Sequence, residues 1–331
     1  MLTLVTGATG LVGNNVVRRL LDQGQAVRVL VRASAAERPL EGLAVERVFG
    51  DICDPASVCA AMADVERVVH SAGDVRIGWT GLERMRRVNV DGTRHVARAA
   101  REAGARLVHV STADAAGIGS YDTPADEETS RRGDVLTPYV VTKREAEQAI
   151  HEEIDRGLWA AIVNPAFMLG PWDWKPSSGQ MLVEVGRGRG TFAPRGDFSV
   201  VDVRDVAAAI LAAFDRGESG RRYLLSGENM SYLDAWRQFA EVAGARRPLT
   251  AIGPVISWLA GRGGDLAARI TGSESNVNSG ALAMAALPKI YSCARAEQEL
   301  GFRRRPLDET IRDAWNWFRE YGYVKGAASG N

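Results

Sequence analysis

Two side chains that could transfer a proton, Tyr139 and Lys143, lie four positions apart in the segment LTPYVVTKREAEQ. This spacing puts them on one face of a helix, one turn from each other. An ammonium group beside a phenol favours the phenolate, so we expect Lys143 to lower the pKa of Tyr139 toward neutrality. A phenol of that acidity can exchange a proton with an alcohol or a ketone. The same spacing also fits a packed tyrosine beside a solvated lysine, and only the position in the fold separates the two interpretations.

Three glycines near the N-terminus predict where a cofactor binds. In VTGATGLVG, Gly7, Gly10 and Gly13 lie between the apolar run LTLVT and a helix expected from Leu11 to Gln23. Glycines in a strand, turn and helix unit let the backbone approach a pyrophosphate at the positive end of the helix. Such turns also occur for packing alone, but at this place in the chain they favour a dinucleotide. The expected cofactor contacts in this turn are Gly7, Thr9, Gly10, Leu11, Val12 and Gly13.

The end of the second predicted strand indicates which dinucleotide is bound. A carboxylate there would bind the ribose diol of NAD, but AVRVLVRAS ends with Arg32 and Ser34 instead. The guanidinium of Arg32 can stack on adenine and pair with a 2′-phosphate, to which Ser34 can donate a hydrogen bond. NADP is therefore favoured over NAD. The alternative is that Arg32 is a solvated surface arginine.

Residues after the next two predicted strands complete the cofactor site. In FGDIC, Asp51 can reach the adenine amino group and Ile52 can line the adenine ring. In VVHSAGD, the small residues Ser71, Ala72 and Gly73 leave room for a ribose. Strand ends favour such residues in any case, so none of them is decisive alone.

Apolar strands alternate with helical patterns through the first half of the chain. The expected strands are LTLVT, AVRVLV, VERVFG, VERVVH, RLVHVS and WAAIVN, with helices between them at 11–23, 55–63, 82–103 and 138–155. Short continuous runs of Val, Ile and Leu between helices predict strands that are covered on both faces. We therefore predict an α/β fold, a doubly wound parallel sheet (Rossmann fold) with a smaller C-terminal substrate lobe.

The alternation changes after Asn164, where NPAFMLGPWDWKPSSGQ concentrates Pro, Gly and Trp. The chain is expected to return to the sheet through FSVVDVRDVAAAILAAFDRG, with Asp205 as the helix cap, and through RRYLLSG. This predicts an NAD(P)-binding Rossmann domain at 1–164, joined again by 198–226. The substrate-binding lobe is then formed by 165–197 and 227–325.

Composition argues against several other classes of protein. The 331 residues include 41 Lys plus Arg and 41 Asp plus Glu without a long run of either sign, which disfavours nucleic acid as a partner. The three cysteines, Cys53, Cys59 and Cys293, lack metal-ligand spacing and are interpreted as reduced thiols. The four histidines lack such spacing as well, so no metal site is expected.

Apolar stretches are too short to predict a membrane span. No basic and then apolar leader precedes the first strand, and no uninterrupted stretch approaches the roughly 20 residues that a spanning helix needs. The most apolar late segment, PVISWLAGRGGDLAARI, is interrupted by Gly261, Arg262 and Asp265. We expect a cytoplasmic protein with no membrane partner, or one that at most touches a surface.

A set of motifs together carries a family resemblance. VTGATGLVG, GDICD, NVDGT, VST, Tyr139 with Lys143, and VNPAFMLGP occur in the order seen in extended short-chain dehydrogenases/reductases, the NAD-dependent epimerase/dehydratase superfamily. The chain resembles that family over nearly its whole length. The resemblance implies that Thr112, rather than Ser111, holds the substrate oxygen and that Tyr139 is the acid/base. It also implies that Lys143 binds the nicotinamide ribose while tuning Tyr139 and that Asn89 braces the active-site strands. The nicotinamide would meet the backbone of Pro165, Ala166, Phe167 and Met168.

This chain departs from the sequence patterns of two branches of the family, which makes those two activities less favoured. Dehydratases usually carry Asp-Glu directly after the catalytic Thr, where this chain has Ala113 and Asp114. Nucleotide-sugar epimerases place an Asn and an Arg that hold the diphosphate where Phe167 and Phe198 stand here. A diphosphate buried against apolar side chains is costly. The chain looks more like the dihydroflavonol-reductase and 3β-hydroxysteroid-dehydrogenase branch, which includes hopanoid-associated sugar epimerase-like proteins.

The resemblance therefore implies an NADP-dependent oxidoreductase that reduces a ketone or aldehyde, or oxidises the alcohol, of an apolar or aromatic small molecule. Two alternatives stay open: an NAD(P)-dependent sugar epimerase-like enzyme without net redox change, and a non-catalytic NADP-binding redox sensor. The family also implies a homodimer through the helices at 82–103 and 138–155. Several aromatic candidates equally fit the core of the second lobe. The expected substrate contacts are Trp79, Asp114, Met168, Trp172, Trp174, Phe192 and Phe198.

Overall fold

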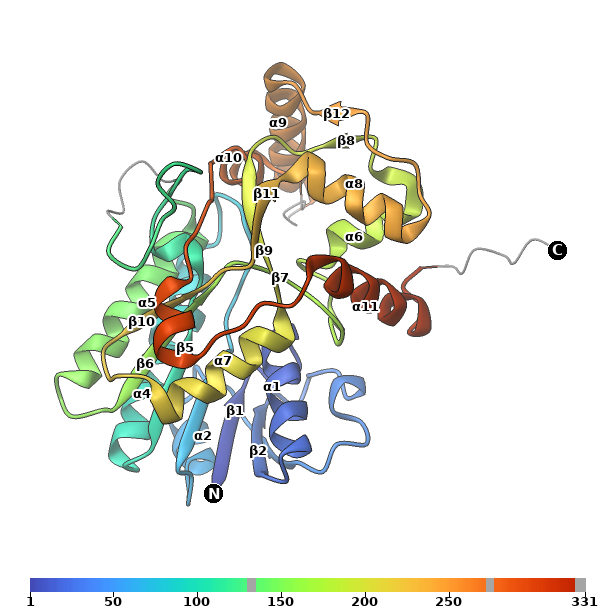
Figure 1. Cartoon of the computed structure of the whole chain (residues 1–331). Helices are drawn as coiled ribbons and strands as arrows, with labels where there is room; N and C mark the ends of the chain where they lie inside the picture. The colour runs from blue at the N-terminus through green and yellow to red at the C-terminus, as the bar shows by residue number, and fades with distance from the viewer. Residues whose placement is uncertain (130–134, 272–276, 325–331) are drawn as a thin grey trace.

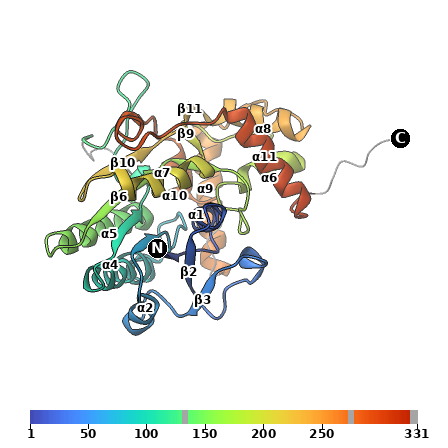
Figure 2. The same cartoon turned by 60° about the horizontal axis from the view of Figure 1, so that its bottom comes forward.

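The computed structural model describes residues 1–129, 135–271 and 277–324. Its centre is a sheet of seven parallel strands in the order β10-β6-β5-β4-β1-β2-β3 (Figures 1 and 2). Because the order reverses between β1 and β4, the carboxyl ends of these two strands border a crevice. The strands are β1 (Leu2–Thr6), β2 (Ala26–Val31), β3 (Glu46–Phe49), β4 (Arg67–His70), β5 (Arg106–Val110), β6 (Ala160–Pro165) and β10 (Arg222–Leu225).

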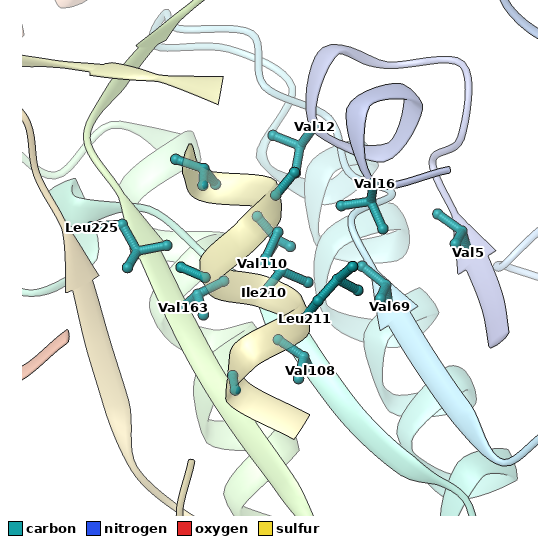
Figure 3. Close-up of a cluster of buried hydrophobic side chains, with 14 of the residues drawn as sticks. Val5, Val12, Val16, Val69, Val108, Val110, Val163, Ile210, Leu211 and Leu225 are labelled. Carbon is teal, nitrogen blue, oxygen red and sulfur yellow. The ribbon is translucent and has the colours of Figure 1, made fainter. Parts of the chain in front are cut away.

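Helices cover both faces of this sheet, which confirms the predicted doubly wound α/β fold. On one face lie α1 (Leu11–Asp22) and α7 (Val203–Arg216), and on the other lie α2 (Pro55–Ala61), α4 (Gly92–Glu102) and α5 (Pro138–Ile154). Side chains alternate along each strand, so Leu4 and Val5 enter different cores. Figure 3 shows Val108, Val110 and Val163 of the sheet beside Ile210 of α7.

One interruption lies within the helix expected at 82–103. It begins as α3 (Leu82–Arg86), passes through a π-helical turn, η2 (Arg87–Asp91), and continues as α4. Asn89 lies in this turn and is buried. Such π-turns concentrate at functional sites, because the extra residue re-aims a side chain.

The second lobe has its own small sheets and its own apolar core. A three-stranded sheet contains β7 (Phe167–Leu169), β9 (Asp197–Asp202) and β11 (Glu228–Ser231), and β8 (Phe192–Ala193) pairs with β12 (Thr250–Ala251). Its helices are α6 (Gln180–Glu184), α8 (Tyr232–Ala243), α9 (Pro254–Thr271), α10 (Ser279–Ala285) and α11 (Leu307–Glu320).

Besides η2, the chain as a whole has short helical turns at η1 (Arg38–Leu40), η3 (Ala113–Ala115), η4 (Val185–Arg189) and η5 (Ala296–Leu300) in its described residues.

Two details of the predicted return to the main sheet at 198–226 are wrong. Strand β9 pairs with β7 and β11 in the second lobe, and only α7 and β10 rejoin the main sheet. The cap of α7 is Asp202, whose side chain accepts the Arg204 backbone N–H at 2.7 Å, because β9 ends at that residue. Asp205 lies in the first turn instead and binds the backbone N–H and the guanidinium of Arg305.

Candidate active site

Helix α5 brings Tyr139 to the carboxyl end of β5. The side chain of Thr137 caps this helix and Pro138 occupies its first position, which fixes Tyr139 in the first turn. The Thr112 hydroxyl, which accepts the Asp114 backbone N–H at 3.3 Å, lies close enough to the Tyr139 phenol to lower its pKa. Ser111 instead donates to the Glu147 carboxylate at 2.6 Å, so it is Thr112 that faces the phenol.

The electrostatic prediction for this pair is wrong. Burial and, to a smaller extent, the Asp114 carboxylate raise the pKa of Tyr139 to about 12, although the neighbouring Thr112 opposes this shift. The Lys143 ammonium donates to the Val110 carbonyl oxygen at 2.8 Å, and burial lowers the pKa of Lys143 to about 8. Helical spacing placed the two residues on one face, but the β5 carbonyl holds the ammonium. The phenol is therefore protonated at neutral pH.

A second lysine, which the sequence did not point to, faces the phenol. Lys289 lies on the segment between α10 and η5, and its ammonium is 3.4 Å from Asp114 Oδ1. Burial by itself would lower the pKa of Lys289, but Asp114 and Tyr232 together hold it above its ordinary value. The positive charge of Lys289 also lowers the pKa of Tyr139, in part cancelling the effects of burial and Asp114. Asp114, predicted as a substrate contact, thus already has a partner.

Asn89 joins three parts of the site, as a bracing residue would. Its amide nitrogen donates to the Asp74 carbonyl oxygen at 2.9 Å and to Thr142 Oγ1 at 3.0 Å, and its amide oxygen accepts the Asp74 backbone N–H at 2.7 Å. These bonds hold the segment after β4 against α5. A Cβ at Gly73 would lie 3.2 Å from the Asn89 amide oxygen and 3.9 Å from Lys143 Nζ. The backbone at Gly73 therefore lies close to the lysine.

The glycine turn after β1 has no room for side chains. Gly7 has φ +72°, and a Cβ there would lie 2.6 Å from the Ala72 backbone nitrogen. A Cβ at Gly13 would lie 2.3 Å from the Gly7 carbonyl oxygen, and Gly10 is the N-cap of α1. Backbone N–H groups at the start of an uncapped helix form a site suited to an anion. These residues fit the pyrophosphate of a dinucleotide, flanked by Thr9, Leu11 and Val12 of the same turn and by Ser71, whose hydroxyl donates to the Thr6 carbonyl oxygen at 2.8 Å.

The residues predicted to bind the adenosine end lie after β2 and β3. Arg32 and Ser34 are exposed there. The Asp51 carboxylate accepts the Cys53 backbone N–H at 2.9 Å and so stabilises its own turn. Ile52 is buried against α4, where a Cβ at Gly92 would lie 2.8 Å from its Cδ1 atom. Packing against α4 is thus enough to explain why an apolar residue stands at position 52. The contact of Ile52 with adenine stays a prediction.

Strand β6 ends at Pro165 and leads directly into β7. The Ala166 backbone N–H donates to the Leu225 carbonyl oxygen at 3.0 Å, which keeps this connection at the sheet. Phe167 and Met168 follow and are partly buried. Phe167 packs edge-on against Phe198, with ring centroids 5.0 Å apart.

Most of the predicted aromatic substrate contacts have other partners. Phe198 is buried and stacks on Tyr232 at 4.0 Å between ring centroids, so it belongs to the core of the second lobe rather than to an open pocket wall. Trp172 and Trp174 pack with Trp317 of α11 in an aromatic cluster. Core packing accounts for these three residues. In contrast, Phe192 and Trp79 are exposed, and Trp79 Nε1 donates to Ser279 Oγ at 2.8 Å.

Comparison with known proteins connects this geometry to a family. A model of the NAD dependent epimerase/dehydratase family matches residues 3–226. The chain belongs to this family. It is similar to sterol demethylase protein B of Methylococcus capsulatus, with 36% identity over 98% of this chain and 100% of that protein. It is also similar to a putative dihydroflavonol 4-reductase of Synechocystis, with 33% identity over 97% of this chain and 95% of that protein.

A solved structure shows the same fold from end to end. The crystal structure of gox2253 matches with a TM-score of 0.85 and 34% identity, covering 98% of this chain and 99% of that one. The match includes both the sheet and the second lobe. This family member is therefore an enzyme, an oxidoreductase of the extended short-chain dehydrogenase/reductase type that acts on small molecules.

In the described part of the chain, no helix is both long and apolar enough to pass through a bilayer. The same residues contain no group of three or more His, Cys, Asp or Glu side chains with the geometry to hold a metal ion.

Proposed function

We propose that this protein is an NADP-dependent carbonyl reductase and alcohol dehydrogenase for apolar or aromatic small molecules. The observation that carries the proposal is the closeness of the buried Tyr139 phenol to Thr112 at the carboxyl end of β5, next to the glycine turn and Lys143. The carboxyl ends of β1, β4 and β5 are neighbours in the sheet. A substrate oxygen between these two hydroxyls would lie beside the dinucleotide crevice.

The chemistry of reduction follows from the two hydroxyl groups. The nicotinamide cofactor, when bound, supplies the hydride that reduces the carbonyl carbon. Thr112 donates a hydrogen bond that polarises the carbonyl oxygen, and Tyr139 donates the proton that this oxygen receives. A pKa of about 12 keeps Tyr139 protonated at neutral pH, so the side chain is ready to act as an acid. Oxidation of the alcohol runs the same steps in reverse and needs the phenolate.

The family contains other reactions, and three features favour net reduction. Phe167 and Phe198, which pack against each other, stand at the positions where nucleotide-sugar epimerases carry the Asn and Arg that hold a diphosphate, so these two side chains offer no polar group to such a substrate. The position directly after Thr112 holds Ala113 instead of an acid. The two curated relatives bear names that refer to a sterol and a dihydroflavonol, both consistent with an apolar or aromatic substrate. An epimerase-like reaction is the second candidate, because the family that the chain matches includes epimerases.

Arg32 gives the proposal a testable cofactor preference. Replacing Arg32 with Ala is expected to weaken NADPH binding about 10- to 100-fold, because charge-assisted hydrogen bonds to the 2′-phosphate would be lost. NADH has no 2′-phosphate, so its dissociation constant should stay the same. Cofactor fluorescence titrations measure both constants. Arg246→Ala, at another exposed arginine, is the matched control, and an equal loss for the two cofactors would refute the role of Arg32.

A carbonyl screen separates the candidate functions. The purified protein is incubated with NADPH or NADH and a panel of apolar ketones and aldehydes, and the cofactor absorbance is followed. Net reduction predicts stoichiometric consumption of NADPH with at least one compound. Tightly retained cofactor without consumption on any compound would favour the epimerase-like reaction, and nucleotide binding without any turnover would favour a redox sensor.

A further inference from the structure

Helix α9 exposes large apolar side chains along most of its length. Val255, Leu259, Leu266 and Ile270 are 68%, 57%, 58% and 78% exposed. At 3.6 residues per turn, these four positions fall within an arc of about 60° and form one apolar stripe. Ile256 and Trp258 beside the stripe are also more than half exposed. Single exposed apolar residues are ordinary, but a continuous stripe marks a contact surface.

The opposite side of α9 is made of small residues and is the side that packs on the protein. A Cβ at Gly261 would lie 2.9 Å from the Cα atom of Ser279, and a Cβ at Gly264 would lie 1.8 Å from the Val277 carbonyl oxygen. These glycines let α9 approach the start of α10 closely. A helix that serves only the core would turn its large apolar residues inward. This helix has the reverse arrangement.

Two of the three charged residues of α9 are arginines. Arg262 and Arg269 follow one edge of the stripe, and the Arg262 guanidinium lies 5.9 Å from the Trp258 ring centroid. The one acidic residue of α9, Asp265, accepts the Ser279 backbone N–H at 3.0 Å. Arginine and tryptophan beside an apolar stripe are typical of helices that lie in the interface of a bilayer.

The stripe lies in the second lobe, on the helix next to α10, which contacts the segments around the candidate site. Figure 1 shows α9 beside α10, at the far end from the N-terminus. Thr137 Oγ1 donates to the Met284 sulfur of α10 at 3.3 Å, two residues before Tyr139. Trp79, on the segment after β4, is bonded to Ser279 at the start of α10. Helix α9 is therefore attached to the part of the lobe that borders the catalytic residues.

We propose that α9 docks the enzyme on the surface of a bilayer with anionic headgroups. The stripe would enter the boundary between headgroups and acyl chains, and Arg262 and Arg269 would reach the headgroup phosphates. This docking extends the expectation, made from the sequence, of at most a surface contact. A second copy of the chain fits less well, because a two-fold contact along the stripe brings like arginines together without a free carboxylate on α9. Docking would also let an apolar carbonyl compound pass from the bilayer along α10 to Tyr139. This second step rests on the proposed function.

Vesicle sedimentation of the full chain tests docking without reference to catalysis. The wild-type chain is expected to sediment with vesicles of phosphatidylcholine and phosphatidylglycerol, and less with phosphatidylcholine alone. The double variant Leu259→Glu/Ile270→Glu should reduce the bound fraction at least about tenfold, because two carboxylates would enter the apolar boundary. Arg262→Gln/Arg269→Gln should remove the difference between the two kinds of vesicle.

The control places a new carboxylate elsewhere on the surface, in exchange for another exposed apolar side chain. Phe49→Glu, on the edge strand β3, replaces a side chain that is 66% exposed and should bind vesicles as the wild type does. Thermal unfolding confirms that each variant is folded. The proposal is overturned if the wild type stays in the supernatant with both vesicles, or if the α9 variant binds as well as the wild type. It is also overturned if light scattering shows an oligomer that Leu259→Glu/Ile270→Glu dissociates, which would make a second copy the occupant.

Discussion

Replacing Tyr139 with Phe is expected to lower kcat/KM for carbonyl reduction about 1000-fold, because no other group supplies the proton to the substrate oxygen. The ring keeps its volume and its packing at the start of α5, so the fold and the cofactor site should be unchanged. NADPH consumption measures the rate, and fluorescence titration measures the dissociation constant of NADPH. The predicted result is a large loss of rate with an unaltered dissociation constant.

Tyr323 provides the matched control for this variant. Its hydroxyl donates to the Trp174 carbonyl oxygen at 2.8 Å, in the aromatic cluster of the second lobe. Tyr323→Phe removes the same atom and a similar hydrogen bond, but it should leave the rate of reduction within about twofold of the wild type. If Tyr139→Phe turned over as fast as Tyr323→Phe, the assignment of the acid would be wrong.

Replacing Lys143 with Met is expected to stabilise the fold while it abolishes most of the activity. A lysine whose pKa falls from 10.5 to about 8 on burial costs the folded chain about 3 kcal/mol at pH 7. Methionine avoids this cost but gives up the hydrogen bond to the Val110 carbonyl oxygen, worth about 1 kcal/mol. The free energy of unfolding should therefore rise by about 2 kcal/mol. The rate should fall about 100-fold or more, since the resemblance assigns this ammonium to the nicotinamide ribose.

The stability gained by Lys143→Met should depend on pH in a direction that can be measured. The cost of the buried ammonium is fully present below pH 8, and it disappears as the pH rises from about 8 to 10.5, where the unfolded lysine also loses its proton. The gain in stability of Lys143→Met over wild type should shrink over that range. Denaturant titrations at several pH values measure it, with Lys175→Met at an exposed lysine as the control. A variant less stable than wild type at pH 7 would contradict the account.

The main sheet was predictable because its signal is local. Short runs of Val, Ile and Leu between helical patterns are typical of parallel strands buried on both faces, and the six strands predicted before residue 165 are present. Strand β9 has a similar apolar run, yet it pairs with β7 and β11. A run of this kind predicts a strand but not its partner. The place of β9 depends on the second lobe, whose packing no short pattern encodes.

The neighbourhood of the candidate site residues was predictable where motifs were compact. Tyr139, Thr112 and Asn89 each sit in a short motif, and the structure places the first two near each other and the third between Asp74 and Thr142, while their roles stay predictions. Helical spacing could not give the direction of the Lys143 side chain, which depends on a carbonyl of another element. Lys289 was missed because nothing in the sequence near it points to Asp114. Its only local signal is a single charge in the apolar segment AALPKIY.

Transfer of deuterium from a labelled cofactor tests the central claim most directly. With NADPH that carries deuterium at the transferred position, a carbonyl compound active in the screen is reduced and the alcohol product is analysed by mass spectrometry. Hydride transfer beside Tyr139 predicts one deuterium on the former carbonyl carbon for each NADPH oxidised, at a rate that Tyr139→Phe suppresses. A product without deuterium, or a labelled product formed equally fast by Tyr139→Phe, would contradict the account.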